Sequence, residues 1–88
     1  MSQPDNKNRV NVTIYGENYR MCSSSSPEYM LRLAKYVDEK MGQIAQTYNH
    51  LGLNRIAVLT AVNLADELFR ARREIRELQN QLYRKNVK

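Results

Sequence analysis

Apolar and polar residues alternate along the first part of the chain and then recur at helical spacing. The alternation begins at residue 10 and is typical of a half-buried strand, with one face formed by Val10, Val12 and Ile14. A two-residue turn at Gly16-Glu17, with glycine first as a type II′ turn requires, places Ile14 opposite Tyr19. This register keeps the apolar residues of both arms on one face. The alternation therefore predicts a β-hairpin over roughly residues 10–22.

The segment after the hairpin has the signals of a helix that begins after a serine run. Serine as N-cap is followed by Pro27 at the first helical position and by Glu28 in the first turn. Apolar residues then recur at steps of three and four: Met30, Leu33, Ala34, Val37, Met41, Ile44, Ala45 and Tyr48. This spacing predicts an amphipathic helix that covers the hairpin. After a break at Gly52, Asn54 is the expected N-cap of a second helix that runs to about Lys85.

The second helix changes its surface near Phe69. Between Ile56 and Phe69 it is apolar on most sides, and its narrow polar strip consists of Thr60, Asn63, Asp66, Glu67 and Arg70. A helix of this kind must be covered on most sides, and one hairpin and one helix of the same chain are too small to do so. A chain of 88 residues also has little stability to spare. We therefore expect a second copy of the chain to supply the remaining cover.

One series of apolar residues at alternating steps of four and three runs through both halves of this helix. It consists of Ala57, Ala61, Leu64, Leu68, Ala71, Ile75, Leu78 and Leu82. Such spacing is typical of the seam of a two-stranded coiled coil, and in a parallel dimer Glu67 of one chain would face Arg72 of the other. The residues expected to mediate self-association are Ala61, Leu64, Leu68, Ala71, Ile75, Leu78 and Leu82.

Together these elements predict an α+β fold: a small ββαα head whose second helix extends into a coiled coil. The expected organisation is a disordered arm over residues 1–9, a head and dimerisation region over 10–69, and a coiled-coil tail over 70–88. Lys85 stands where the next seam residue is due, so the seam is short. A dimer is therefore the expected minimum assembly.

The net charge of +5 sits entirely on the last part of the chain. Residues 1–69 hold seven Lys/Arg and seven Asp/Glu, whereas residues 70–88 hold seven Lys/Arg and two Asp/Glu, which gives 7 − 2 = +5. These basic residues lie outside the seam, whereas a DNA-binding basic zipper places its basic stretch ahead of the zipper. Nucleic-acid binding is therefore disfavoured as an alternative, and the tail charge is interpreted as a solvated helix face.

No group of residues in the sequence indicates an enzyme, a cofactor or a metal site. There is no glycine-rich phosphate loop, the only histidine, His50, has no nucleophile partner, and the single Cys22 excludes an internal disulfide. We interpret five acidic residues as helix-cap or solvent-facing: Glu28, Asp38, Glu39, Asp66 and Glu67. No apolar run is long enough for a membrane span or a signal peptide, so we expect a cytoplasmic protein with no membrane contact.

Two stretches resemble the ZapA family of bacterial cell-division proteins: V-x-I-Y-G-x-x-Y-R at Val12–Arg20 and TAVNLADEL at Thr60–Leu68. The order of hairpin, capped helix and long helix extends the resemblance over about residues 10–85. The family implies a homodimer built on the long helix, paired in some members into a tetramer through the coil. It also implies binding to FtsZ, the tubulin-like GTPase that polymerises at the division septum. The resemblance thus implies a non-enzymatic adaptor that crosslinks FtsZ filaments and stabilises the division ring.

The resemblance further implies partner-binding residues on the head: Glu17, Arg20, Asn54, Arg55 and Asn63. Glu17 is acidic where some relatives are basic. Asn63 has the alternative role of fixing the dimer register or bonding within the head, and Arg20 that of a solvated strand residue. Beside the FtsZ adaptor, two other functions stay open: a basic coiled-coil nucleic-acid binder and a generic oligomerisation module.

Overall fold

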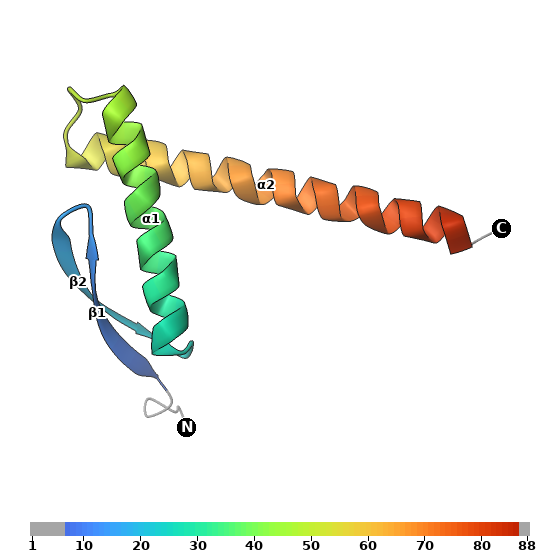
Figure 1. Cartoon of the computed structure of the whole chain (residues 1–88), viewed down its shortest axis with the longest axis horizontal. Helices are drawn as coiled ribbons and strands as arrows, with labels where there is room; N and C mark the ends of the chain where they lie inside the picture. Colours follow the sequence, from blue (N-terminus) through green and yellow to red (C-terminus); the bar gives the residue numbers. More distant parts are fainter. Residues whose placement is uncertain (1–6, 87–88) are drawn as a thin grey trace.

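The computed structural model describes residues 7–86, which form two strands followed by two helices (Figure 1). The elements are β1 (Asn8–Ile14), β2 (Glu17–Ser23), α1 (Pro27–Thr47) and α2 (Leu53–Asn86). The predicted α+β fold, a ββαα head with a long second helix, is confirmed. Residues 1–6 of the expected arm lie outside the described residues, whereas Asn8 and Arg9 already belong to β1.

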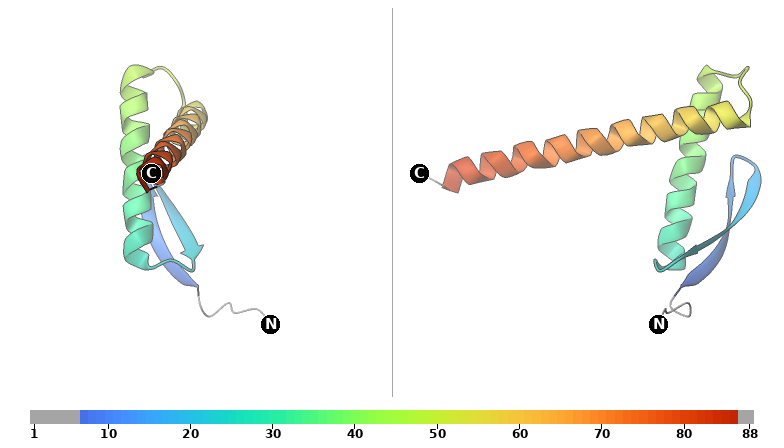
Figure 2. Two further views of the ribbon diagram at one scale, coloured as in Figure 1. Left: turned by 90° about the vertical axis from the view of Figure 1, so that its right-hand side faces the viewer. Right: turned by 180° about the vertical axis from the view of Figure 1, so that it is seen from behind.

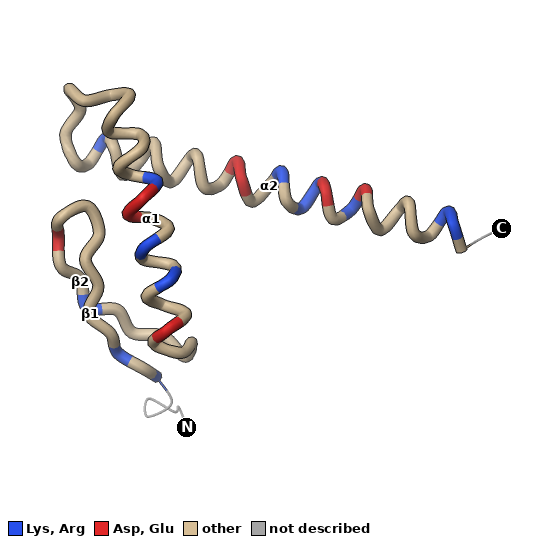
Figure 3. Tube along the Cα trace, in the orientation of Figure 1, with Lys and Arg blue, Asp and Glu red and all other residues tan. Residues whose placement is uncertain are grey.

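Helix α1 lies along one face of the hairpin, and α2 crosses the second half of α1 before extending away from it (Figures 1 and 2). The small core lies between these elements, and its buried apolar side chains are Val12, Met30, Ala34, Met41 and Ile56. Because the core uses only the first part of α2, the remainder projects by roughly 25–30 Å at 1.5 Å per residue. Lys and Arg outnumber Asp and Glu on this projecting part (Figure 3).

The hairpin turn is Tyr15-Gly16, one residue earlier than predicted. Both residues have positive φ, 51° at Tyr15 and 79° at Gly16, as a type I′ turn requires. Tyrosine rarely adopts this conformation, because its Cβ crowds the neighbouring backbone. The N–H of Tyr15 donates to Oδ1 of Asp38 on α1 at 2.7 Å. This charge-assisted bond ties the turn to α1 and helps to hold the strained residue.

The strand register differs from the prediction by two residues. Ile14 pairs with Glu17, and Tyr19 pairs with Val12, so the predicted opposition of Ile14 and Tyr19 is wrong. Because side chains alternate with a period of two, an even shift leaves each of them on its predicted face. Val12 is accordingly buried beneath α1, as the alternation required.

The two helices differ in how well the sequence predicted their starts. Helix α1 begins as predicted, with Oγ of Ser26 accepting the N–H of Tyr29 at 3.1 Å. Helix α2 begins at Leu53, so Asn54 lies in its first turn and its predicted N-cap role is wrong. The carbonyl of Gly52 accepts the N–H of Ile56 at 3.0 Å, which puts glycine at the start of the helical hydrogen bonding.

The side of α2 that packs on the head is set by Ile56 and Thr60. Both are buried, although Thr60 belongs to the polar strip of this helix. Its hydroxyl donates to the carbonyl of Ile56 at 2.7 Å, and a hydroxyl satisfied within its own helix is tolerated in a core. The apolar residues on the other sides of α2 are consequently left outside the core. Val58 and Val62 are each 62% exposed.

We predict that two substitutions of Tyr15, in the hairpin turn, change the free energy of unfolding in opposite directions. Tyr15→Asn should raise the free energy of unfolding by roughly 0.5 kcal/mol, because asparagine tolerates the left-handed region. Tyr15→Val should lower it by about 1–2 kcal/mol, because a β-branched residue is strained there. Urea unfolding followed by circular dichroism measures both. If the turn lay at Gly16-Glu17, residue 15 would be a strand position, and valine would be favoured over asparagine.

Candidate self-association and partner-binding surfaces

The predicted seam lies on the surface of the protomer. Leu64 is half-buried beside the head, and the other six residues of the predicted self-association set are exposed: Ala61, Leu68, Ala71, Ile75, Leu78 and Leu82. Leu82 is 61% exposed and Ile75 54%, although both are large apolar side chains. Burying one such side chain contributes about 1.5–3 kcal/mol, so a matching helix laid along this row would be strongly stabilised. The geometry suits a second copy of α2.

A second apolar surface flanks the seam on the first half of α2. Leu59, Val62 and Asn63 face the end of α1 across a hollow that is also lined by Ile44, Tyr48 and Asp66. Leu59 also lines a neighbouring hollow with Leu51, Asn54, Arg55 and Val58. The apolar face of this half of α2 is therefore wider than the seam alone, as the sequence predicted. Within the protomer nothing that the structure describes covers it.

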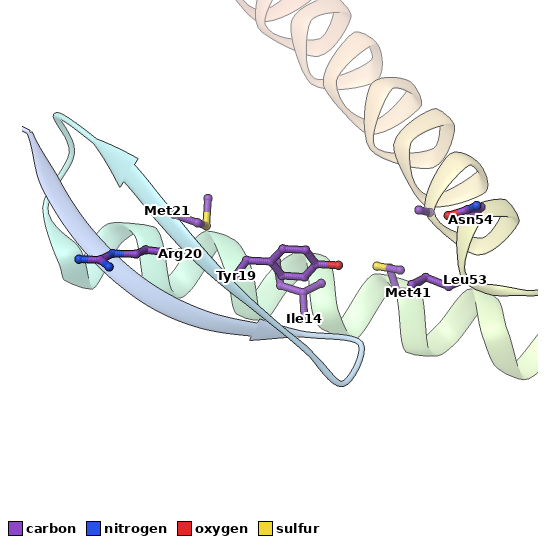
Figure 4. A pocket seen from close by; sticks show the side chains of 8 residues that line it. Ile14, Tyr19, Arg20, Met21, Met41, Leu53 and Asn54 are labelled. Carbon is purple, nitrogen blue, oxygen red and sulfur yellow. The ribbon is translucent and has the colours of Figure 1, made fainter.

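A third surface is the groove between the hairpin and the first turns of α2 (Figure 4). Its apolar lining comes from Ile14, Tyr19, Met21, Met41, Leu53 and Ala57. Arg20 and Asn54 add polar groups, and the guanidinium of Arg20 points away from the other labelled side chains (Figure 4). Ala57 is also the first residue of the seam series, so this groove opens directly onto the seam.

The structure places four of the five predicted partner-binding residues on a groove and two hollows, and the fifth outside them. Arg20 and Asn54 line the hairpin groove, and Asn54 also lies with Arg55 at the hollow beside Leu51. Asn63 lines the hollow against α1. Leu59 belongs both to this hollow and to the hollow beside Leu51. Glu17 is exposed at the start of β2 and lines none of these three surfaces. Asn54 is thus the residue that joins the hairpin groove to the helix surfaces.

A hydrogen bond and an ion pair, both to Glu67, join α1 to α2 beyond the buried Ile56 and Thr60. We call this group of contacts the bridge at Glu67. The hydroxyl of Tyr36 donates to Oε1 of Glu67 at 2.6 Å, and Nζ of Lys40 forms an ion pair with Oε2 of the same residue. The bond from Lys40, followed by that from Tyr36, lowers the pKa of the Glu67 carboxyl. The same bonds raise the pKa of Lys40 and of Tyr36, in each case chiefly through Glu67.

Two acidic residues have structural roles that the sequence does not indicate. Asp38 accepts the N–H of Tyr15, and Glu67 binds α1, so the interpretation of both as cap or solvent-facing residues is wrong. Glu67 was also expected to face Arg72 of a second chain, but in this structure its carboxylate is engaged within its own chain. No sequence signal reveals these contacts, because each partner lies more than twenty residues away.

The described residues form neither a cluster of metal ligands nor a helix suited to span a membrane. Among residues 7–86 no three His, Cys, Asp or Glu side chains gather as metal ligands would. In the same range, no helix combines the length and apolar character needed to span a membrane. The surfaces that the structure does present are apolar grooves and charged helix faces, which are features of protein association.

Comparisons with known proteins agree on one family. The sequence matches the family profile "Cell division protein ZapA" over residues 10–87. It is 41% identical to the protein of that name from Halalkalibacterium halodurans over 75 residues, which cover 85% of this chain and 82% of the relative. It is 38% identical to the one from Geobacillus kaustophilus over 76 residues, covering 86% and 84%. The fold matches a solved ZapA mutant dimer from Geobacillus stearothermophilus with a TM-score of 0.70, 36% identity and 93% coverage of both chains.

The bridge at Glu67 predicts a pH dependence of stability with two limbs. Because the pKa of Glu67 is lowered, its ionised carboxylate stabilises the folded state fully above the usual pKa of 4.5. This stabilisation is lost as the pH falls through the lowered pKa. Because the pKa of Tyr36 and of Lys40 is raised, these protonated groups stabilise the folded state fully below their usual pKa values of 10.0 and 10.5. Their stabilisation is lost as the pH rises through the raised values.

Glu67→Gln should flatten both limbs of the melting temperature measured against pH by circular dichroism. Tyr36→Phe is the matched variant, because it keeps the ion pair between Lys40 and Glu67 and so should keep most of the acid limb. The side chains of Lys40 and Glu67 are 22% and 36% exposed, so solvent screens the pair and the change should be small. An acid limb that is identical in the wild type and in Glu67→Gln would show that the bridge does not contribute.

Proposed function

The chain belongs to the ZapA family of cell division proteins, and on this premise we propose that it is a non-enzymatic adaptor that crosslinks FtsZ filaments. It would act in the cytoplasm, at the division septum, and stabilise the division ring. The head and dimerisation region, residues 10–69, would hold the filament, and the coiled-coil tail, residues 70–88, would extend the pairing. A dimer is the minimum unit of this function.

The observation that carries the proposal is the uncovered apolar surface along α2. One protomer leaves Val58, Val62 and Ile75 more than half exposed, and the similar solved structure is described as a dimer. A symmetric dimer carries two copies of every head surface. Two equivalent surfaces suit a crosslinker, because each can hold a different filament.

Individual contacts in such an adaptor can be weak. A filament presents its subunits at regular intervals, so a molecule held by one head searches for its second contact at high effective concentration. Linked binding of this kind multiplies modest affinities without any further contact. This suits the head, whose grooves are open and shallow rather than enclosed.

The contact surface that we favour on the head is the hairpin groove with Arg20 and Asn54. It combines an apolar floor with the amide of Asn54, and the guanidinium of Arg20, which points away from this floor, would meet the partner beside the groove. Arg55 and Asn63 would extend this surface along α2, and Glu17 would extend it along the hairpin. In this arrangement Asn54 is central, because it lines both the hairpin groove and the hollow beside Leu51.

Co-sedimentation with polymerising FtsZ at near-physiological salt tests the proposal. The wild type should enter the pellet with the filaments and increase their bundling. Arg20→Glu should weaken this binding by roughly tenfold, or about 1.4 kcal/mol, if Arg20 belongs to the contact. Arg9→Glu is the matched control, because Arg9 is an exposed arginine in the other strand of the same hairpin and lies outside the groove.

Absence of the wild type from the filament pellet would contradict the adaptor function. Equal loss in Arg20→Glu and Arg9→Glu would leave the function standing but would replace the groove with diffuse charge as the source of binding. Retention on duplex DNA with a steep salt dependence would instead favour the nucleic-acid alternative.

A further inference from the structure

Where the head region ends and α2 begins to project, a phenylalanine lies among three arginines. Phe69 is 62% exposed, and the guanidinium carbon of Arg72 lies 5.8 Å from the centre of its ring. Arg73 and Arg76 complete a shallow hollow that these four residues line by themselves. We call these four residues the Phe69 patch. It combines an apolar centre with a cationic rim.

The Phe69 patch lies outside the seam of the coiled coil. With Leu68 and Ile75 at position a, Phe69 and Arg76 fall at b, Arg72 at e and Arg73 at f. A two-stranded coil buries positions a and d, so pairing along the predicted seam leaves the ring of Phe69 uncovered. Phe69 is also the last residue of the half of α2 that is apolar on most sides, so a second copy that covered this half beyond the seam would be the competing occupant of the ring.

The three arginines of the patch have no carboxylate partner among the described residues. The neighbouring Arg70 does have one, because its Nε lies 3.0 Å from Oδ2 of Asp66. Glu74 follows Phe69 by five residues, which places it about 140° around the helix at 100° per residue. Glu77 follows Arg73 by four residues and lies nearer to the patch, but among the described residues no carboxylate oxygen is within ion-pair distance of these three arginines. Three positive charges therefore line the hollow around one apolar ring.

We propose that the Phe69 patch is a docking site for a short acidic peptide segment of a partner protein, one with carboxylates on both sides of an apolar residue. Arginine binds carboxylates through two parallel hydrogen bonds, and the exposed ring would cover the apolar side chain. The inference does not depend on the identity of the filament protein. In a symmetric dimer the site occurs twice.

The size of the patch favours a peptide over a nucleic acid. From Phe69 to Arg76 the helix rises roughly 10 Å, the length of three residues of an extended chain. Proteins that hold duplex DNA by its backbone commonly neutralise about 6–10 phosphates, far more than three arginines can. Proteins that hold a single strand stack successive bases on several aromatic rings, and this patch has one ring.

Fluorescence anisotropy with the full-length protein tests the site. The probe is a labelled synthetic peptide with two glutamates on each side of a leucine, and a peptide with the leucine replaced by serine is its control. The triple variant R72Q/R73Q/R76Q should weaken binding at least about tenfold. The control triple variant R84Q/K85Q/K88Q removes the same charge further along the chain and should change binding less than about threefold.

The ring is tested separately from the charge. Phe69→Ala should weaken binding of the leucine peptide by roughly three- to tenfold and leave the serine peptide unaffected, whereas Phe69→Leu should retain most of the binding. The mass of each variant is measured by light scattering, so that a change in assembly is recognised. A lower mass for Phe69→Ala would assign the ring to an interface between copies and overturn the proposal.

Three further results would overturn it. Equal losses in the two triple variants would mean diffuse attraction to the basic tail. Failure of the leucine peptide to bind the wild type up to about 1 mM would mean that the patch has no useful affinity. Binding of an oligothymidine strand more tightly than the peptide, lost in R72Q/R73Q/R76Q, would assign the patch to single-stranded nucleic acid.

Discussion

The structure depends on the mismatch between the apolar surface of α2 and what one protomer can cover. The head uses one side of α2, defined by Ile56 and Thr60, and this side is fully packed. The sides that carry Val58, Val62 and the seam residues have no cover in the same chain. Exposed apolar surface of this extent is unfavourable in water, so its burial against a second copy would be stabilising. The hairpin groove and the two hollows, which are the candidate surfaces, all include residues of this helix.

The contacts within the head make α2 a fixed extension of it. Ile56 anchors the first turns in the core, and Glu67 ties the helix to α1 three turns later through Tyr36 and Lys40. Two attachments along one rigid helix fix its direction as well as its position. When two copies pair through α2, the separation of their heads is therefore set by the helix. Such a fixed separation of the heads would suit the crosslinking adaptor that we propose.

Much of the fold could be predicted from local patterns, and the errors occurred where a contact distant in sequence decided the outcome. Alternation, the serine cap and the regular apolar spacing correctly gave two strands and two helices. The turn was misplaced because Tyr15 adopts a conformation that Asp38, a residue on another element, helps to hold. The burial of Thr60 could not be predicted from its polarity, because its hydroxyl bonds to its own helix and so tolerates burial. The candidate site was least predictable, since neither spacing nor residue type indicates which residues share a groove.

The mass of the protein in solution over a series of concentrations tests the central claim most directly. If a second copy covers α2, sedimentation velocity should give a dimer or a larger assembly down to about 1 μM. Ile75→Glu, which places a charge in the seam, should shift the assembly toward the 10.3 kDa protomer. A folded, helical wild type with the mass of a single protomer at every concentration would contradict the account.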